Sequence, residues 1–278
     1  MGTLMPPLLI DIVRLTAWLV ILGLMFAPLE RLFALRKVEA RRSILPDLGY
    51  FYFNGLLPTF LMAAPLAILA SGVRAFTPEF WREMVTALPF WASIAIGLIV
   101  AEIGSYWAHR WAHRSPTLWR FHAIHHTPDH IDWLINSRAH PVDIVFTRLG
   151  GLLPLYLLGL DGGGTERGFV PLLIVVIGTF WSFFVHANVR WRFGPLEQIV
   201  ATPAFHHWHH TNDEHRDHNF AATLPIVDRL FGTFYLPDHF PAVYGIDEPV
   251  PPTLHDELVR PFAIAGRRAA PNASASDA

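Results

Sequence analysis

Long apolar stretches without a charged residue dominate the first two-thirds of the chain. Leu48 to Val73 contains 26 such residues in a row, and Met84 to Ala101 and Gly168 to Val185 contain 18 each. A helix needs about 18–20 apolar residues to cross the hydrocarbon core of a bilayer. Leu15 to Leu29 adds a fourth stretch of 15 residues. Buried core helices of a soluble protein are the alternative, but stretches of this length favour a polytopic membrane protein.

A fifth apolar segment, Ile144 to Leu160, is weaker because Arg148 and two glycines interrupt it. It predicts either a full span or one arm of a hairpin with the next apolar segment. A glycine-rich turn over residues 161–165 would join the two arms. The expected fold is therefore all-α, a membrane helical bundle of four to five spans.

Positive charge predicts the orientation of this bundle. The loop after the first span contains five cations: Arg31, Arg36, Lys37, Arg41 and Arg42. The next loop contains only Arg74 and Arg82. Cytoplasmic loops are enriched in Lys and Arg, so the first loop is expected in the cytoplasm. No cleavable signal is expected, because a basic n-region and a small-residue cleavage site are both missing. Alternating the spans places every histidine-rich segment on the cytoplasmic side.

Composition supports a membrane protein and excludes several chemistries. Hydrophobic residues make up 52% of the chain and charged residues 16%, against about 25% charged in an ordinary soluble domain. The formal net charge of −2 gives no basic surface for nucleic acid. The chain has no cysteine, which excludes disulfides, thiolate-ligated haem, cysteine-bound iron–sulfur clusters and thiol catalysis.

Histidine is the unusual residue. Fourteen of the sixteen histidines lie between His109 and His218. Most fall in an HxxxH motif, two HxxHH motifs and one position after an apolar stretch, at spacings that place imidazoles on one helical face. The residues are His109 and His113; His122, His125 and His126; His206, His209 and His210; and His186.

This set predicts a metal centre. Neutral imidazole suits iron, zinc and copper. Nine candidate ligands are more than one tetrahedral zinc can use, and they suffice for two metals. A zinc peptidase is disfavoured because Arg110 stands where HExxH has its glutamate. Bis-imidazole haem would leave most of the histidines without a role. A metal transporter would need ionisable ligands within several spans, whereas these ligands gather at one end.

Four motifs in this order resemble the fatty acid hydroxylase/sterol desaturase superfamily. They run from about residue 102 to 235. The motifs are Tyr106-Trp-Ala-His-Arg-Trp-Ala-His113, Leu118-Trp-Arg-Phe-His-Ala-Ile-His-His126, Thr202-Pro-Ala-Phe-His-His-Trp-His-His210 and Asp228-Arg-Leu-Phe-Gly-Thr233. The resemblance implies a non-haem centre of two Fe ions at the cytoplasmic face, with the nine histidines as ligands. It also implies an enzyme that uses O2 and two electrons to hydroxylate or desaturate a lipid C–H bond.

Two further residues enter through the resemblance. Relatives usually have an aspartate seven residues before the first histidine, and Glu102 stands there in this chain. Glu102, like Asp143 and Asp228, is a candidate to accept an imidazole N–H from outside the ligand shell. The third histidine box is variable in this superfamily. Here it offers His186 and then Asn188, so Asn188 is a candidate to complete the site.

The remaining predictions concern organisation and partners. Residues 1–262 are expected to form one integral membrane domain, and residues 263–278 a disordered tail. The partners are expected to be a lipid substrate from the bilayer and an external electron donor of ferredoxin or cytochrome b5/reductase type. An ether-lipid-cleaving monooxygenase and a non-catalytic metal-binding or transport protein are the alternative functions. Arg138 is expected to contact the cap or a lipid headgroup, and tryptophans such as Trp119 to line a channel or anchor the interface.

Overall fold

A computed structural model describes residues 6–37, 44–160, 169–251 and 253–263. These residues form helices and loops, with two isolated β-bridges. The α-helices are α1 (Pro7–Phe33), α2 (Ile44–Phe76), α3 (Glu79–Ala87), α4 (Phe90–Arg114), α5 (Pro116–His126), α6 (Pro141–Leu157), α7 (Phe169–Val185), α8 (Pro203–His209), α9 (Ile226–Phe231) and α10 (Leu254–Ala263). Two 3-10 helices, η1 (Trp133–Ser137) and η3 (Gly194–Gln198), complete the set. The all-α prediction is confirmed.

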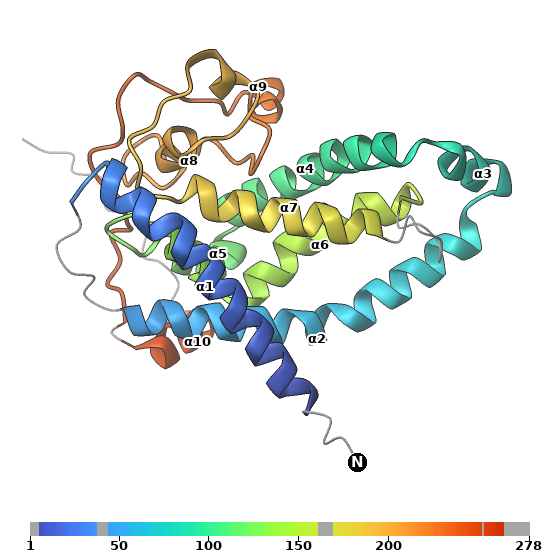
Figure 1. The fold of residues 1–278 in the computed structure, drawn as a ribbon, viewed down its shortest axis with the longest axis horizontal. Coiled ribbons are helices and arrows are strands. Elements are labelled where there is room, and N and C mark those ends of the chain that lie inside the picture. Colours follow the sequence, from blue (N-terminus) through green and yellow to red (C-terminus); the bar gives the residue numbers. More distant parts are fainter. Residues whose placement is uncertain (1–5, 38–43, 161–168, 252, 264–278) are drawn as a thin grey trace, which may run out of the picture.

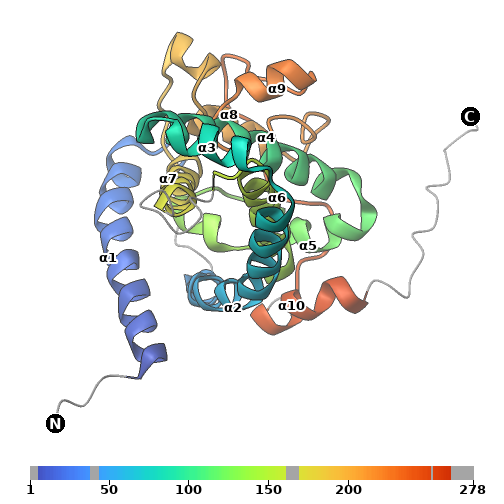
Figure 2. The same ribbon diagram turned by 90° about the vertical axis from the view of Figure 1, so that its right-hand side faces the viewer.

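The long helices form the bundle, with the short helices α8 and α9 at one end of it and the short helix α3 at the other (Figure 1). Helices α2, α4, α6 and α7 run lengthwise, while α8 and α9 lie together beside the end where α4 and α7 finish (Figure 1). Helix α1 lies at the edge of the bundle, and α10 lies next to α2 and α5 (Figure 2). Helices α5 and α8, with the last turns of α4, form the histidine-rich cap that the sequence predicts.

Within the described part of the chain, three helices, α1, α2 and α4, are long and apolar enough to cross a membrane. Helix α7 is equally apolar but has 17 residues. Many large apolar side chains on these helices are exposed, including Leu24 and Ile68 at 73% each. Exposure of this kind suits contact with lipid rather than water. The predicted glycine-rich turn at 161–165 and the predicted tail after Ala263 lie outside the described residues.

The predicted span from Met84 to Ala101 is wrong in its boundaries. Helix α3 ends at Ala87, and Pro89 starts a new helix that runs on to Arg114. Proline fixes φ and lacks an N–H, so it begins a helix more readily than it continues one. The shifted helix matters for the site, because α4 carries His109 and His113 on its last turns.

Glycines in α6 pack this helix against α4 instead of breaking it. A Cβ on Gly104 would lie 2.2 Å from the carbonyl oxygen of Gly150, and one on Gly151 would lie 2.5 Å from the Ser105 hydroxyl. Small residues allow membrane helices to approach closely. This contact places the first turn of α6, with Asp143, beside the histidines at the end of α4.

Candidate metal centre

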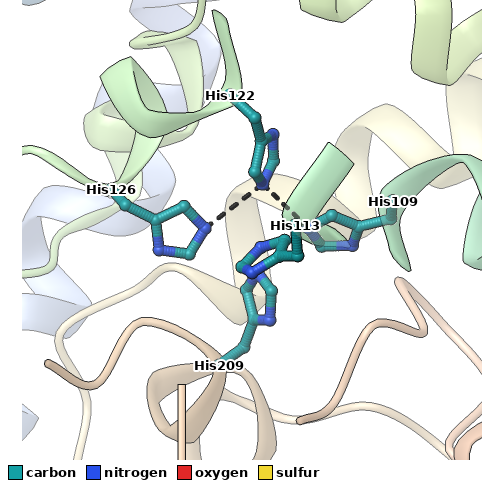
Figure 3. A group of neighbouring side chains, drawn as sticks. All are labelled: His109, His113, His122, His126 and His209. Atoms are coloured by element: carbon teal, nitrogen blue, oxygen red, sulfur yellow. Dashed lines mark hydrogen bonds between the residues drawn. The ribbon is translucent and has the colours of Figure 1, made fainter. Parts of the chain in front are cut away.

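Nine histidines converge in the cap and form two groups of possible metal ligands. The first group, shown in Figure 3, consists of His109, His113, His122, His126 and His209. The second group consists of His125, His186, His206 and His210. Within each group the candidate ligand atoms lie within 4.8 Å of one another. The two groups together contain the nine histidines that the sequence motifs single out.

Each HxxHH motif contributes to both groups. On α5, His122 and His126 point to the first group and His125 to the second. On α8 and its C-cap the division is reversed, because His209 joins the first group while His206 and His210 join the second. Helical spacing explains this, since residues i and i+4 share a face and i+3 lies to one side of it. The two groups are therefore neighbours that share two helices.

Local structure holds these short helices firmly. The Ser115 hydroxyl caps α5 by accepting from the Leu118 N–H, and the Thr202 hydroxyl caps α8 by accepting from the Phe205 N–H. Proline occupies the first turn of both helices, where its missing N–H has no cost. All residues of α8 are buried, so its histidines cannot turn toward solvent.

In the first group, four imidazoles donate their Nδ1–H away from the centre. His109 donates to the Phe220 carbonyl at 2.8 Å, and His209 donates to the His218 carbonyl at 2.9 Å. The other two, His113 and His122, bond carboxylates. Donation through Nδ1 fixes the tautomer, so the Nε2 lone pair of each ring points into the group.

Asp143 and Asp217 are the two carboxylate partners. Asp143 is buried and accepts from His122 Nδ1 with both oxygens at 3.1 Å. Asp217 accepts from His113 Nδ1 at 3.1 Å, and its side chain is 54% exposed. A carboxylate next to an imidazole ligand fixes the ring and increases its basicity. Asp143 therefore has the role that the sequence proposed for it.

In the second group the partners are backbone carbonyls. His125 donates its Nδ1–H to the Arg138 carbonyl at 3.1 Å, and His186 donates to the Ser182 carbonyl at 2.6 Å. Their Nε2 atoms then face each other at 3.1 Å. The Nε2 of His186 also lies 3.0 Å from that of His206 and 3.1 Å from that of His210.

The facing Nε2 atoms test whether these residues fit a metal. His125 and His186 both use their Nδ1 proton elsewhere, so two lone pairs meet at 3.1 Å without a proton between them. His109 and His122 repeat this arrangement in the first group, also at 3.1 Å. Two imidazoles bound side by side to one ion at ~2.1 Å would have their nitrogens about 3 Å apart. The donor set in each group fits a cation.

Burial keeps the imidazoles of the cap in the ligand form. Burial and the neighbouring His122 lower the pKa of His125 to about 3. The pKa values of His206, His209 and His210 are likewise well below the ordinary value, with burial as the largest cause. Neutral imidazole is the form that binds metal, so no deprotonation is needed at neutral pH.

The comparison with known proteins agrees with this geometry. A family model described as fatty acid hydroxylase matches residues 94–233, half of the chain. The chain belongs to the fatty acid hydroxylase family. The matched region contains all nine histidines and extends from α4 past α9. Together with the three candidate spans, it makes this chain an integral membrane protein.

The relatives of this chain act on several lipids, as their names state. Ornithine lipid hydroxylase OlsE of Rhizobium tropici is 35% identical over 206 residues, which cover 73% of this chain and 59% of that protein. Alkylglycerol monooxygenase of Homo sapiens is 30% identical over 165 residues, 58% of this chain and 34% of that protein. Methylsterol monooxygenase 2-2 of Arabidopsis thaliana is 25% identical over 221 residues, 76% and 79% of the two chains.

This chain therefore spans about three-fifths of the ornithine lipid hydroxylase and a third of the alkylglycerol monooxygenase. No solved structure matches this chain. The resemblance that the motifs indicate is confirmed at the level of the family.

Glu102 bonds a different partner from the one predicted in this family's motif. Its carboxylate accepts from the Thr223 N–H at 3.0 Å and from the Thr223 hydroxyl. The bonds that the structure gives to Glu102 therefore go to a loop and not to an imidazole. Asp228 bonds the same loop, because its two oxygens accept from the N–H groups of Phe220 and Ala221 at 2.8 Å. Burial raises the pKa of Asp228 to about 6, although these hydrogen bonds lower it.

The two carboxylates hold a loop that contacts the first histidine group. Phe220, whose N–H bonds Asp228, presents its carbonyl to His109 Nδ1. Glu102 and Asp228 therefore reach the first group through the loop whose Phe220 carbonyl accepts from His109. The sequence identified both residues but assigned them direct contact with an imidazole.

Asn188 lies two residues beyond His186, but its side chain bonds the backbone of Arg36. Its Oδ1 accepts from the Arg36 N–H at 3.2 Å, and its Nδ2 donates to the Arg36 carbonyl at 2.9 Å. Both polar atoms of the amide are therefore used to join the segment after α7 to the segment after α1. The position of Asn188 argues against the predicted role in completing the metal site.

A second support of the site was missed. Asn54 in α2 donates to the carbonyls of Ser137 and Ala139 at 2.9 and 2.8 Å. These residues flank Arg138, whose carbonyl accepts from His125 Nδ1. The signal was present in the sequence, since an asparagine interrupts a long apolar stretch at this position. A polar residue inside a span usually has a structural or functional partner.

The side chain of Arg138 fixes the same segment from the other side. Its guanidinium bonds Asp47 at 3.0 Å, the Thr127 hydroxyl at 3.1 Å and Glu257 of α10. Tyr50 donates to the other oxygen of Glu257 at 2.8 Å. Arg138 thus contacts the cap, as one of its two predicted roles has it, and it connects α2 and α10 to the second histidine group.

Proposed function

We propose that each histidine group holds one iron ion and that the two ions form a non-haem diiron centre. The facing Nε2 lone pairs of His125 and His186 in one group, and of His109 and His122 in the other, carry this proposal. Each pair is a donor set that only a cation or a proton stabilises. The ligands are all imidazoles, a type that suits iron.

The proposed activity is O2-dependent hydroxylation of a lipid C–H bond. The iron centre, when bound, supplies the oxidising power that no side chain has. In the balanced reaction, one oxygen atom enters the C–H bond, and two electrons and two protons reduce the other to water. The backbone carbonyls and carboxylates around the rings keep every Nε2 aimed inward, and the apolar helices give a lipid access from the bilayer.

Names of relatives suggest which lipid to test first. Ornithine lipid is the first choice, because the ornithine lipid hydroxylase matches 73% of this chain. Alkylglycerols are the second choice, because the alkylglycerol monooxygenase of Homo sapiens matches 58%. Desaturation and ether cleavage are reactions of the same chemical class and give different products. A metal transporter is disfavoured, because both ligand groups lie at one end of the bundle.

The cap is proposed to face the cytoplasm, where an external electron donor of ferredoxin or cytochrome b5/reductase type would reach it. The five cations after the first span support this orientation. A topology reporter fused after Arg42 or after Pro237 is expected in the cytoplasm. A reporter within residues 162–164 is expected outside, and finding it on the cytoplasmic side would contradict the hairpin.

The function is tested by metal counting and lipid analysis on the same preparation. Protein purified with iron is expected to hold two Fe per chain by elemental analysis. Cells that express the protein are expected to accumulate a lipid heavier by one oxygen atom, and a His186→Ala variant is expected not to. A lipid lighter by two hydrogens would show desaturation instead. Loosely exchanging metal with an unchanged lipid profile would favour transport and contradict the proposal.

A further inference from the structure

Arg148 is a charged residue within the apolar bundle that the candidate metal centre does not use. It lies in the middle of α6, which packs against α4 and α2, and it is partly buried. Among the residues that the structure describes, neither a carboxylate nor another hydrogen-bond acceptor bonds its side chain. A charged side chain inside a membrane bundle is costly, and it usually pairs with another group or marks a substrate site.

The helical position of Arg148 directs it toward the interior of the bundle. Leu153 and Leu157 are 42% and 55% exposed and mark the outer face of α6. At 3.6 residues per turn, Arg148 lies about 140° around the helix from Leu153 and about 180° from Leu157. Leu155 is fully buried, and a Cβ on Gly97 of α4 would lie 3.4 Å from it. Because residues seven apart share a helical face, Arg148 faces inward as Leu155 does.

The direction of α6 brings the Arg148 side chain toward the histidines. Side chains in an α-helix are inclined toward the helix N-terminus. The N-terminus of α6 is its histidine end, because Asp143 in the first turn accepts from His122. Arg148 follows Asp143 by five residues, which is about 7.5 Å along the helix axis. The guanidinium is therefore placed between the apolar interior of the bundle and the metal centre.

The acids on the neighbouring helices are turned to other groups. Asp143 keeps its charge, but both of its oxygens face His122 beside the first histidine group. Glu102, the acid of α4, bonds Thr223, and Asp47, the acid of α2, bonds Arg138. Helix α7 contains no charged residue. The guanidinium of Arg148 is thus available to an anionic group that comes from outside the protein.

We propose that Arg148 binds the carboxylate of an anionic lipid and thereby places a C–H bond of that lipid at the metal centre. The inference rests on the proposed function and names its class of substrate. The planar guanidinium offers a fork of N–H donors that matches the two oxygens of a carboxylate. One arginine and one carboxylate leave no net charge inside the bundle. A fixed charged end also determines which carbon atoms of the chain reach the oxidant.

The first test measures binding and needs no turnover. The purified full chain in neutral detergent is given radiolabelled hexadecanoate or its methyl ester, at a pH at which the acid is ionised. Hexadecanoate is expected to bind about 10–100-fold more tightly, the range for hydrogen bonds to charged groups. Hexadecyl methyl phosphate, a phosphodiester with the same alkyl chain, is expected to bind more weakly than hexadecanoate. Equal or tighter binding of this phosphodiester would overturn the assignment to a carboxylate.

Substitution of Arg148 is expected to remove the preference for the carboxylate. Arg148→Met keeps an unbranched side chain without the charge, so hexadecanoate should lose its advantage over the ester while the ester affinity changes little. Arg148→Lys should keep part of the advantage, because it retains the charge without the planar fork. The matched control is Arg82→Met, an exposed arginine of α3 at the far end of the bundle (Figure 1). An unchanged advantage of hexadecanoate in Arg148→Met would overturn the site.

Thermal unfolding separates a ligand-binding role of Arg148 from a structural one. A buried charge without a partner destabilises the fold, so ligand-free Arg148→Met is expected to unfold at the same temperature as wild type or above it. Excess hexadecanoate is expected to raise the unfolding temperature of wild type more than that of Arg148→Met. A lower unfolding temperature for Arg148→Met, with the same rise on adding hexadecanoate, would assign a structural role instead.

Iron content and lipid analysis distinguish this inference from the proposed function. In cells, Arg148→Met is expected to hold two irons and to form about 10–100-fold less of the oxidised lipid. Wild-type protein without iron, but with a carboxylate preference that depends on Arg148, would overturn the proposed function and leave the anion site standing. Two irons and equal amounts of oxidised lipid in wild type and Arg148→Met would overturn the anion site.

Discussion

The two histidine groups share helices α5 and α8 but differ in what surrounds them. Around the first group, two of the four described Nδ1 partners are carboxylates, Asp143 and Asp217. Around the second group, the described partners are the carbonyls of Arg138 and Ser182. A carbonyl fixes the tautomer and orientation of the ring, whereas a carboxylate also adds negative charge beside a bound cation. The first group is therefore adapted to hold more positive charge.

The two groups also differ in their connection to the rest of the molecule. The first group reaches solvent through Asp217 and Trp119. The second is joined by the Arg138 segment to α2 and α10, within a buried network of charged side chains. The first group thus lies nearer to solvent, and the second is held by side chains from several helices. Substitutions in or near one group test how it differs from the other.

Removing a central ligand is expected to have the largest effect. His122→Ala deletes an Nε2 that faces those of His109 and His126, and His186→Ala deletes one that faces three others. Each variant is expected to hold one iron per chain and to lose lipid oxidation completely, because both ions are needed. Elemental analysis and lipid mass spectrometry measure the two effects.

The matched control lies on the same helix. His207 is buried between the ligands of α8, but it bonds the Ala187 carbonyl and the Tyr244 hydroxyl. His207→Ala is expected to keep both irons and to lose about 1–3 kcal/mol of stability. A His122→Ala or His186→Ala protein that inserts normally, holds two irons and oxidises its lipid would contradict the ligand assignment.

Substitution of the carboxylates beside the first group is expected to have the next largest effect. Asp143→Asn keeps the size of the side chain but removes its charge, so iron affinity of the first group is expected to fall about 10–100-fold. Asp217→Asn is expected to cost less, because water screens an exposed carboxylate. Iron release to a chelator, followed over time, separates the two groups. Faster release from the second group in either variant would contradict the comparison.

The support of the second group is tested through Asn54. Asn54→Ala leaves the buried carbonyls of Ser137 and Ala139 without their donor, at a cost of about 1–3 kcal/mol in stability. Because His125 bonds the carbonyl between them, the second group is expected to release its iron first. Ser71→Ala, which removes a hydroxyl that bonds within α2, is the control. Equal release from both groups in Asn54→Ala would show that the network does not position His125.

Glu102→Gln is expected to have a smaller effect. Glutamine can still accept from the Thr223 N–H, but it loses one of the two carboxylate oxygens that hold this loop. Asp228 still accepts from the N–H groups of Phe220 and Ala221, so His109 is expected to lose little of its orientation. Iron affinity of the first group is expected to fall less than in Asp143→Asn. A larger fall would show that Glu102 acts on the histidines directly.

The sequence predicts which histidines come together better than it predicts their division into two groups. Helical spacing is enough to gather all nine histidines, because imidazoles at i, i+3 and i+4 point to one side of a helix. The opposite sorting of the motifs on α5 and α8 depends on how these helices face each other across the cap. Spacing along the chain carries no information about that angle. The same limit explains Glu102, whose helical face is predictable but whose partner, Thr223, is 121 residues away.

Pro89 and Asn54 are local signals in the sequence whose structural effect appears only in the fold. Pro89 divides the apolar stretch that the sequence joins into one span, and the helix that follows it carries His109 and His113. Asn54 interrupts the longest stretch without a charge, and it proves to hold the Arg138 segment. Both residues are visible in the sequence. Only the fold shows that they help to place the histidines of the cap.

The smallest effect is expected at Asn188. Asn188→Ala removes two hydrogen bonds to the backbone of Arg36, which is expected to cost about 1–3 kcal/mol in stability. The second group is expected to keep its iron, because His186 is oriented by the Ser182 carbonyl within its own helix turn. Thermal unfolding and iron content measure the two quantities on one sample. Loss of one iron per chain, with little change in the unfolding temperature, would show instead that Asn188 completes the second site, as its place in the motif predicts.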